Sequence, residues 1–234
     1  HSRSYTHLIK TIFPNPSEIF DQILTDEAIV CRAKSITGQY NSFLDLGNRS
    51  KTDLYLLLIS INILEGIRFY VSFACSFAFG TNGLMLKSAK IMQKIAQDEN
   101  LHLQISQFLL KTLPKDDNDF AIIAKANEDV VLEMYSIACN EEIAWAEHLF
   151  KFGPILGLNS ELIEQYVKWL TNKRLNAIGL PKLWAKTGSN PLPWLSDWLN
   201  SKANQPLPQE EELTSYLIGG VNKSTQVNLS DFEL

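Results

Sequence analysis

Residues 54–79 read LYLLLISINILEGIRFYVSFACSFAF, and this stretch decides the fold. It is apolar and long enough to cross a membrane. However, Asn62, Glu65 and Arg68 lie near its centre. Charges at that depth are costly in lipid, whereas the interior of a large helical protein can pair them or use them as ligands. We therefore expect a buried helix in a protein with no membrane partner.

Helical periodicity continues on both sides of this stretch, where Leu, Ile and Met recur every three or four residues. The alternating apolar runs that are typical of strands are missing from the sequence. These patterns predict an all-α helical bundle in residues 1–200. Residues 201–234 are polar, contain prolines and lack periodicity, which predicts a flexible, disordered tail. The expected helices cover residues 1–13, a short segment from 16, 25–46, 52–79, 84–113, 118–152, a segment from 160 and a short one near 194.

The composition describes a globular protein of 234 residues, 45% of them hydrophobic, with a net charge of −5. That length allows one domain, or one and a half, with a real core. The sequence has no basic block and no aromatic-basic stripe, so we expect no nucleic-acid partner. Cys31, Cys75 and Cys139 are too few and too far apart for a disulfide framework or a CxxC metal site. With the lack of a signal-peptide pattern, they favour a cytoplasmic protein.

The sharpest local signal is a Glu-x-x-His pair, Glu99 and His102, in the sequence QDENLH. A spacing of three places both side chains on one face of a helix. In ferritin-like bundles, two such pairs and one Glu from each of two other helices hold two metal ions. An isolated pair also arises by chance as two exposed side chains, so its surroundings must decide between these interpretations.

Glu65 is the second signal, because an unpaired carboxylate is expensive to bury in so apolar a helix. Two kinds of compensation are open. Arg68 lies three residues further on and is placed to form an ion pair with Glu65. Alternatively, Glu65 faces Glu99 and His102 from a neighbouring helix, and these oxygen and nitrogen donors are of the kind that iron and manganese accept.

The other histidines are His1, His7 and His148. His1 shares a helix face with Tyr5 in the sequence HSRSYTH, and a phenol beside a redox metal is an oxidisable group. A tyrosine one turn from a histidine is nevertheless common in ordinary helices. We interpret His7 and His148 as surface or interface histidines, since His148 has no acidic partner three residues before it.

Five separated blocks, in this order along the chain, carry a resemblance to a known family. The chain resembles the small, radical-carrying subunit of class I ribonucleotide reductase, and is most like the class Ia enzymes of enteric bacteria and their phages. The resemblance implies a ferritin-like bundle with a di-iron centre, or manganese in its place, beside a stable tyrosyl radical. The blocks are HSRSYTH at 1–7, LEGIRFYVSFACSFAF at 64–79, IAQDENLH at 95–102, SNPLPW at 189–194, and SYLIGG at 215–220 before a terminal DFEL.

The resemblance also implies roles for individual residues. The radical would form on Tyr5, and Asp98 would hydrogen-bond the ligand His1, as metal-bound imidazoles generally require. The implied metal ligands are His1, Glu65, Glu99 and His102, and the implied apolar shell around the radical is Phe69, Phe73 and Ile95.

The same resemblance implies a function for the tail, residues 201–234. Tyr216 matches a tyrosine that relays the radical toward the large subunit, and Glu210 matches an acidic residue that assists it. Residues 228–234 resemble the peptide that docks on the large subunit, where ribonucleoside diphosphates are reduced to deoxyribonucleotides. A segment that becomes ordered on binding gives specificity with modest affinity. The family forms homodimers, so we expect one for the complete small subunit.

Two family ligands are missing from this sequence: a Glu three residues before His1 and an Asp on the preceding helix. The tryptophan that begins the family's radical relay is missing too. The resemblance therefore predicts a fragment truncated at the N-terminus, inactive alone and active after assembly with a complementary N-terminal fragment. Two other functions stay open: a non-catalytic module that binds the large subunit through its tail, and another ferritin-like oxidase or metal-storage protein.

Overall fold

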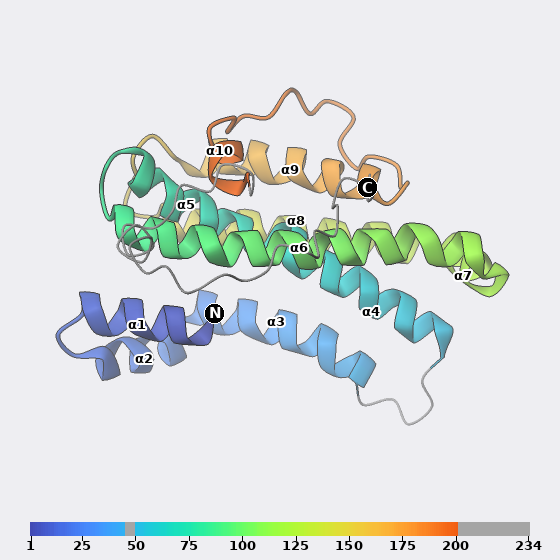
Figure 1. Cartoon of the computed structure of the whole chain (residues 1–234), viewed down its shortest axis with the longest axis horizontal. Helices are drawn as coiled ribbons and strands as arrows, with labels where there is room; N and C mark the ends of the chain where they lie inside the picture. Colours follow the sequence, from blue (N-terminus) through green and yellow to red (C-terminus); the bar gives the residue numbers. More distant parts are fainter. Residues whose placement is uncertain (45–49, 201–234) are drawn as a thin grey trace, which may run out of the picture. The chain divides into compact units, whose positions relative to one another are not determined.

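The apolar stretch forms three consecutive helical elements in the computed structural model of the chain, which describes residues 1–44 and 50–200 (Figure 1). These elements are α4 (Lys51–Ile63), a π-helical turn η1 (Leu64–Arg68) and α5 (Tyr70–Thr81). The helix expected over residues 52–79 is therefore present, with a π turn in its middle. The apolar pattern does not reveal this turn, because the residues on both sides of it are equally hydrophobic.

The other described elements are helices as well, and the described residues contain no strand beyond an isolated bridge between Ile155 and Leu158. The predicted all-α fold is confirmed. One expected helix is wrong in extent, because residues 118–152 form two helices that meet at Asn127, whose side chain donates to the carbonyl of Ile123 at 2.8 Å. The remaining helices are α1 (Ser2–Ile12), α2 (Pro16–Thr25), α3 (Glu27–Leu44), α6 (Leu86–Asp116), α7 (Asn118–Ala126), α8 (Glu128–Leu149), α9 (Ser160–Ala177) and α10 (Leu195–Leu199).

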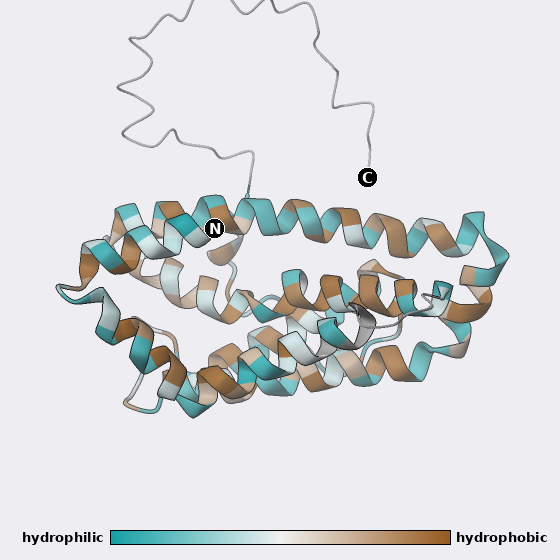
Figure 2. Cartoon of the chain, turned by 90° about the horizontal axis from the view of Figure 1, so that it is seen from below, coloured by the Kyte–Doolittle hydropathy of each residue, from teal (hydrophilic) through white to brown (hydrophobic). Residues whose placement is uncertain are grey.

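The core of the bundle lies around α4, η1 and α5. The long helix α6 packs along α4 and α5, and α8 packs against α9. Figure 1 shows α1, α2 and α3 on one side of α5, α6 and α8, with α9 and α10 on the other side. Figure 2 shows hydrophobic and hydrophilic residues interspersed along the helices, as expected where one helix face is buried and the other meets solvent. Fully buried side chains of the central elements are Ile59, Ile63, Ile67, Val71 and Phe77.

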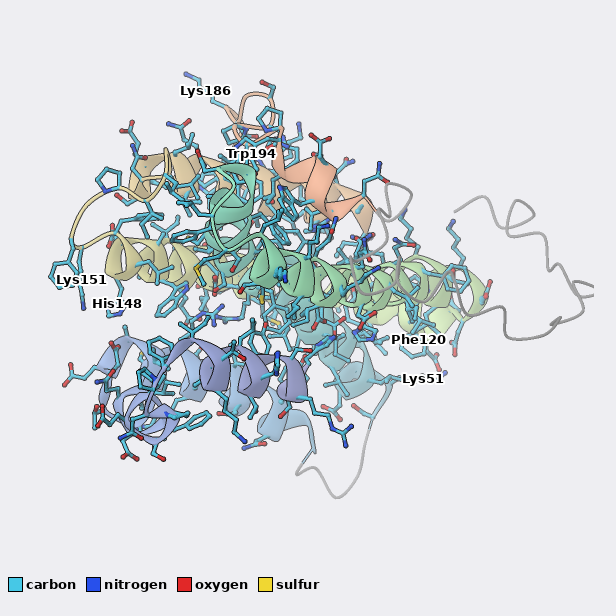
Figure 3. All side chains as sticks on the ribbon, turned by 60° about the vertical axis from the view of Figure 1, so that its left-hand side comes forward. Lys51, Phe120, His148, Lys151, Lys186 and Trp194 are labelled. Carbon is cyan, nitrogen blue, oxygen red and sulfur yellow. The ribbon has the colours of Figure 1, made fainter. Side chains whose placement is uncertain are left out.

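The beginning of α4 is fixed by local capping and by contacts with α7. Ser50 and Asp53 form a reciprocal capping box, with the side chain of each bonded to the backbone N–H of the other. Lys51 reaches across to the start of α7, where its Nζ lies 2.6 Å from Asp117 Oδ2 and 5.7 Å from the centre of the Phe120 ring (Figure 3). These contacts hold the first turn of α4 in place.

The described residues contain one helical segment, Lys51–Thr81, that is long and apolar enough to cross a membrane. In the structure, 61% of its most apolar window is buried inside the protein. Arg68 in this segment is 1% exposed, and its Nη1 lies 2.6 Å from Glu141 Oε2 on α8. These contacts favour the interpretation of the segment as a core helix.

A buried hydrogen-bond chain links α4, α6 and α8, and its removal is expected to destabilise the bundle. Tyr135 donates to Asn62 Oδ1 at 2.6 Å, and Asn62 Nδ2 donates to Ser106 Oγ at 2.8 Å. Replacing Tyr135 by phenylalanine leaves Asn62 Oδ1 without its donor, so we expect the free energy of unfolding to fall by about 1–3 kcal/mol in chemical denaturation. Combining Tyr135→Phe with Asn62→Leu should cost less than the sum of the two single changes. Strict additivity would contradict this account.

The predicted tail, residues 201–234, lies outside the described residues, and so do Glu210 and Tyr216.

Candidate metal centre

Glu65 lies in the π turn, and its carboxylate is not paired with Arg68. The guanidinium of Arg68 instead forms its ion pair with Glu141, which removes the salt-bridge alternative for Glu65. The side chain of Glu65 is 15% exposed. π turns occur mostly as single widened turns inside α-helices, frequently at functional sites. The fold thus presents a largely buried carboxylate whose compensation must come from elsewhere.

That compensation comes from α6, which brings the Glu-x-x-His pair to Glu65. His102 Nδ1 lies 3.5 Å from Glu65 Oε2 and 3.4 Å from Glu99 Oε2. One ligand atom from each of these three residues lies within 4.8 Å of the others. Glu99 is buried, whereas His102 is exposed. We call Glu65, Glu99 and His102 the carboxylate cluster.

The electrostatics of the carboxylate cluster favour a bound cation. Burial raises the pKa of Glu65 to about 6, and the charge of Glu99 adds to this rise while His102 opposes it. Burial also raises the pKa of Glu99, again against the effect of His102. Apart from the ion-pair contact with His102 Nδ1 at 3.5 Å, Glu65 Oε2 is buried without a hydrogen-bond partner among the described residues. Two carboxylates and an imidazole with an unsatisfied oxygen fit a divalent iron or manganese ion, since these metals accept oxygen and nitrogen donors.

His1 lies beside the carboxylate cluster. Its Nδ1 is 2.8 Å from Glu99 Oε1, and its Nε2 is 3.2 Å from Asp98 Oδ2. The imidazole therefore contacts an expected ligand through one nitrogen and an expected orienting carboxylate through the other. A carboxylate on the second nitrogen fixes the tautomer of a ligating histidine.

Tyr5 lies on α1 and is 41% exposed. Burial and the charge of Glu99 both raise its pKa, so the phenol lies within electrostatic reach of the carboxylate cluster. Of the three residues implied as its apolar shell, Phe73 and Ile95 are buried and Phe69 is half-buried. The ring centres of Phe69 and Phe73 are 6.1 Å apart. Their role around a radical stays a prediction.

Tyr40 on α3 is a residue near the site that sequence reasoning missed. Burial raises its pKa to about 12, with further contributions from the charges of Glu65 and Glu99. The carboxylate cluster therefore raises the pKa of a second tyrosine as well. The sequence around it offers no signal, because Tyr40 lies within an ordinary helical segment and has no acidic or histidine partner at a ligand spacing.

The other two histidines lie apart from the carboxylate cluster in their contacts. His7 is exposed on α1. His148 lies near the end of α8 (Figure 3), stacks on Trp145 with ring centres 5.3 Å apart, and has its Nε2 3.3 Å from Asp26 Oδ2. These contacts are structural, and they make His148 a half-buried histidine between helices, in agreement with the second half of its interpretation as a surface or interface histidine.

The helical bundle and the carboxylate cluster together define a class, the ferritin-like proteins that build metal sites from side chains on facing helices. A solved structure in this class, the ribonucleotide reductase R2 subunit from Clostridium botulinum, is similar to this chain with a TM-score of 0.78 and 31% identity. The similarity covers 86% of this chain and 62% of that one.

Two curated relatives carry the description ribonucleoside-diphosphate reductase subunit beta. The protein of Haemophilus influenzae is 42% identical over all of this chain and 69% of its own length. The protein of Enterobacteria phage T4 is 38% identical over 95% of this chain and 66% of its own length. The family described as ribonucleotide reductase, small chain, matches residues 1–191. The chain belongs to this family.

Proposed function

We propose that this chain acts as a small-subunit polypeptide of ribonucleoside-diphosphate reductase that holds part of a dinuclear metal centre and stores a radical on Tyr5. The observation that carries the proposal is the carboxylate cluster with the unsatisfied buried oxygen of Glu65. We expect iron in the centre, with manganese as the alternative, because both metals accept carboxylate and imidazole ligands. The relatives' printed name, ribonucleoside-diphosphate reductase, supports a ribonucleoside diphosphate as the molecule that is reduced. We expect a deoxyribonucleotide as the product and the cytoplasm as the location of the enzyme.

The residues would divide the work as follows. Glu65, Glu99, His102 and His1 would bind the metal pair, and Asp98 would orient His1 through the contact at 3.2 Å. When bound, a dinuclear iron or manganese centre supplies the oxidising equivalent. The Tyr5 phenol would become a neutral radical by giving one electron to that oxidised centre and one proton to a basic oxygen atom of the site. The buried helices α4 to α6 would keep water and reductants away from the metal side of the site.

Further ligands belong to the proposal as well. A dinuclear site in this class takes about six protein ligands, of which this sequence offers four at the carboxylate cluster and His1. We therefore place the remaining carboxylates on polypeptide outside residues 1–234, whether in a complementary fragment or in the same protein. A complete small subunit would be a homodimer, like others in the family.

The tail carries the proposed link to the large subunit. Tyr216 would relay the radical outward, Glu210 would assist it, and residues 228–234 would dock on the large subunit. Removing residues 228–234 should weaken binding to the large subunit by about tenfold or more, equivalent to about 1.4 kcal/mol, without changing metal content. Calorimetry and metal analysis of the two forms measure both quantities.

The whole proposal is tested by assembling the chain with its complementary polypeptide and the large subunit, then adding Fe(II) and dioxygen, followed by a ribonucleoside diphosphate and a dithiol that supplies the two electrons for its reduction. We expect stoichiometric metal and formation of the deoxyribonucleotide. An assembly that binds the large subunit yet holds no iron or manganese would instead identify a non-catalytic interaction module. Metal-dependent oxidase activity that survives removal of the tail would identify a different ferritin-like protein.

A further inference from the structure

Two backbone carbonyls of the π turn are bonded to arginines that come from other helices. Arg174 on α9 donates its Nε–H to the carbonyl of Gly66 at 3.0 Å. Arg32 on α3 donates from Nη2 to the carbonyl of Arg68. The two acceptors lie immediately after Glu65 and at the end of the turn. The turn that carries Glu65 is thus held from two directions.

A π turn needs such support more than an α-helical turn does. Its i to i+5 hydrogen bonding shifts the carbonyls out of the regular ladder, and isolated π turns are rare. Gly66 and Arg68 are both buried, so water does not serve their carbonyls. Hydrogen bonds from a charged donor are stronger than bonds between neutral groups. Each arginine therefore brings a charged donor to a buried carbonyl of the widened turn.

Arg174 is built into the core for this contact. It is 8% exposed, and its guanidinium lies 5.0 Å from the centre of the ring of Tyr70, the first residue of α5. The packing against the turn is close, since a methyl group added to Gly66 would lie 3.3 Å from Arg174 Nε and 2.9 Å from Leu103 Cδ1. Leu103 follows His102 on α6, so the π turn packs closely against the helix that carries the Glu-x-x-His pair.

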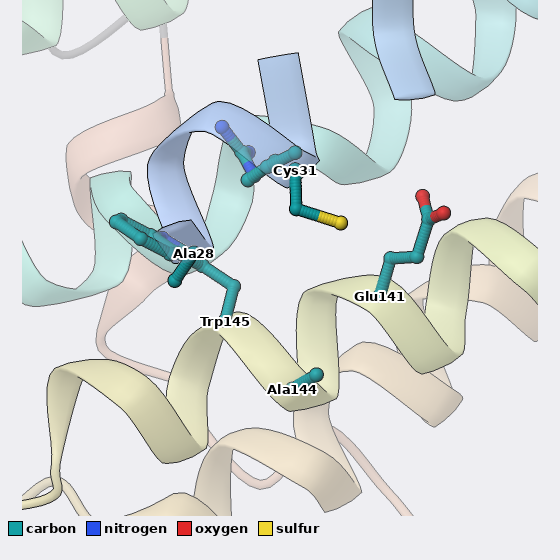
Figure 4. A pocket seen from close by; sticks show the side chains of 6 residues that line it. Ala28, Cys31, Glu141, Ala144 and Trp145 are labelled. Atoms are coloured by element: carbon teal, nitrogen blue, oxygen red, sulfur yellow. The ribbon is translucent and has the colours of Figure 1, made fainter. Parts of the chain in front are cut away.

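Arg32 is held in its own position by α8. Its Nε donates to Glu142 Oε1 at 2.8 Å, and its guanidinium lies 5.4 Å from the Trp145 ring centre. A small open pocket between α3 and α8 borders this arginine, with Cys31 facing Glu141 and Ala144 (Figure 4). The pocket leaves room for a lysine side chain at position 32.

We propose that Arg174 and Arg32 are positioning residues that hold the π turn so that the carboxylate of Glu65 faces Glu99 and His102. The inference rests on the proposed function, because it treats Glu65 as a metal ligand. Neither arginine touches the carboxylate cluster through a contact described above. Each acts through the backbone of the turn.

The main test replaces Arg174 by methionine, which keeps the length and removes the donor. The matched control is Lys173→Met, since Lys173 is the exposed neighbour on the same helix and lies over Trp169 instead of the turn. Mn(II) alone is titrated into the assembled protein, and free Mn(II) is followed by electron paramagnetic resonance. We expect Arg174→Met to bind Mn(II) about tenfold more weakly, as for other residues that orient metal ligands, and the control to bind as the parent does.

Hydrogen exchange of the metal-free protein supplies a second readout. Arg174→Met should speed exchange of the amides in residues 64–68 while the rest of α4 and α5 stays protected. If that variant does not fold, Arg32→Lys replaces it, because a lysine keeps the charge beside Glu142 but lacks the second donor for the Arg68 carbonyl. Unchanged exchange in residues 64–68 of a folded variant overturns the inference. Failure of the parent itself to bind Mn(II) or Fe(II) refutes the proposed function instead, and the exchange result still decides the role of the arginines.

Discussion

Replacing Tyr5 by phenylalanine is expected to abolish the tyrosyl radical signal of the assembled, metal-loaded protein. Phenylalanine keeps the ring and its packing but has no O–H group to give up as a proton and an electron. Tyr5 is the expected radical site because the family resemblance implies it, and it lies one helical turn from His1. The metal content should stay unchanged, since the phenol is not an expected ligand. Electron paramagnetic resonance and metal analysis of the same sample measure both quantities.

Tyr40→Phe is the matched control, because Tyr40 is a second tyrosine whose pKa is raised by the charges of Glu65 and Glu99. The radical signal should survive this change. If the signal instead persists in Tyr5→Phe and is lost in Tyr40→Phe, the assignment of the radical to Tyr5 is wrong. Since Tyr5 is 41% exposed in this chain, samples should be frozen within the first seconds, before reductants in solution quench the signal.

The helical fold could be predicted from the sequence because helical periodicity is a local property. Apolar residues repeat every three or four positions from α1 to α9, and the caps and prolines between them mark most of the boundaries. The π turn at Leu64–Arg68 could not be predicted in this way, since a widened turn leaves the surrounding apolar run unbroken. The break at Asn127 was missed for a related reason. No glycine or proline marks it, although Asn127 is a favoured residue at a helix start and Glu128 and Asp129 follow it in the first turn of α8.

The candidate site was partly visible in the sequence. The spacing of Glu99 and His102 and the buried position of Glu65 suggested the carboxylate cluster, and the structure brings these three side chains together. The partner of Arg68 was not visible, because Glu141 comes from a distant helix and only tertiary packing brings it near. The same holds for Arg32 and Arg174. Their contacts with the π turn join helices that are far apart along the chain.

Replacing Glu99 by glutamine is expected to weaken metal binding without lowering the stability of the metal-free protein. Glu99 contacts both histidines of the site, with Oε1 2.8 Å from His1 Nδ1 and Oε2 3.4 Å from His102 Nδ1. Removing its charge should weaken Mn(II) binding by more than about 100-fold, or about 2.8 kcal/mol. Without metal, the same change removes a buried carboxylate whose pKa burial has raised, so the free energy of unfolding should not fall at pH values above the ordinary glutamate pKa of 4.5.

The sign of this second effect separates a metal site from an ordinary ion-pair network. A folded-state pKa above the ordinary value means that ionising Glu99 costs stability as the pH rises, and glutamine has no such cost. If Glu99 served only to pair with His1 and His102, glutamine would lower stability and leave Mn(II) binding unaffected. Glu147→Gln, an exposed change on α8, controls for the loss of one negative charge and should alter neither quantity. Titration with Mn(II) and chemical denaturation at two pH values therefore decide whether these carboxylates are held together for a metal.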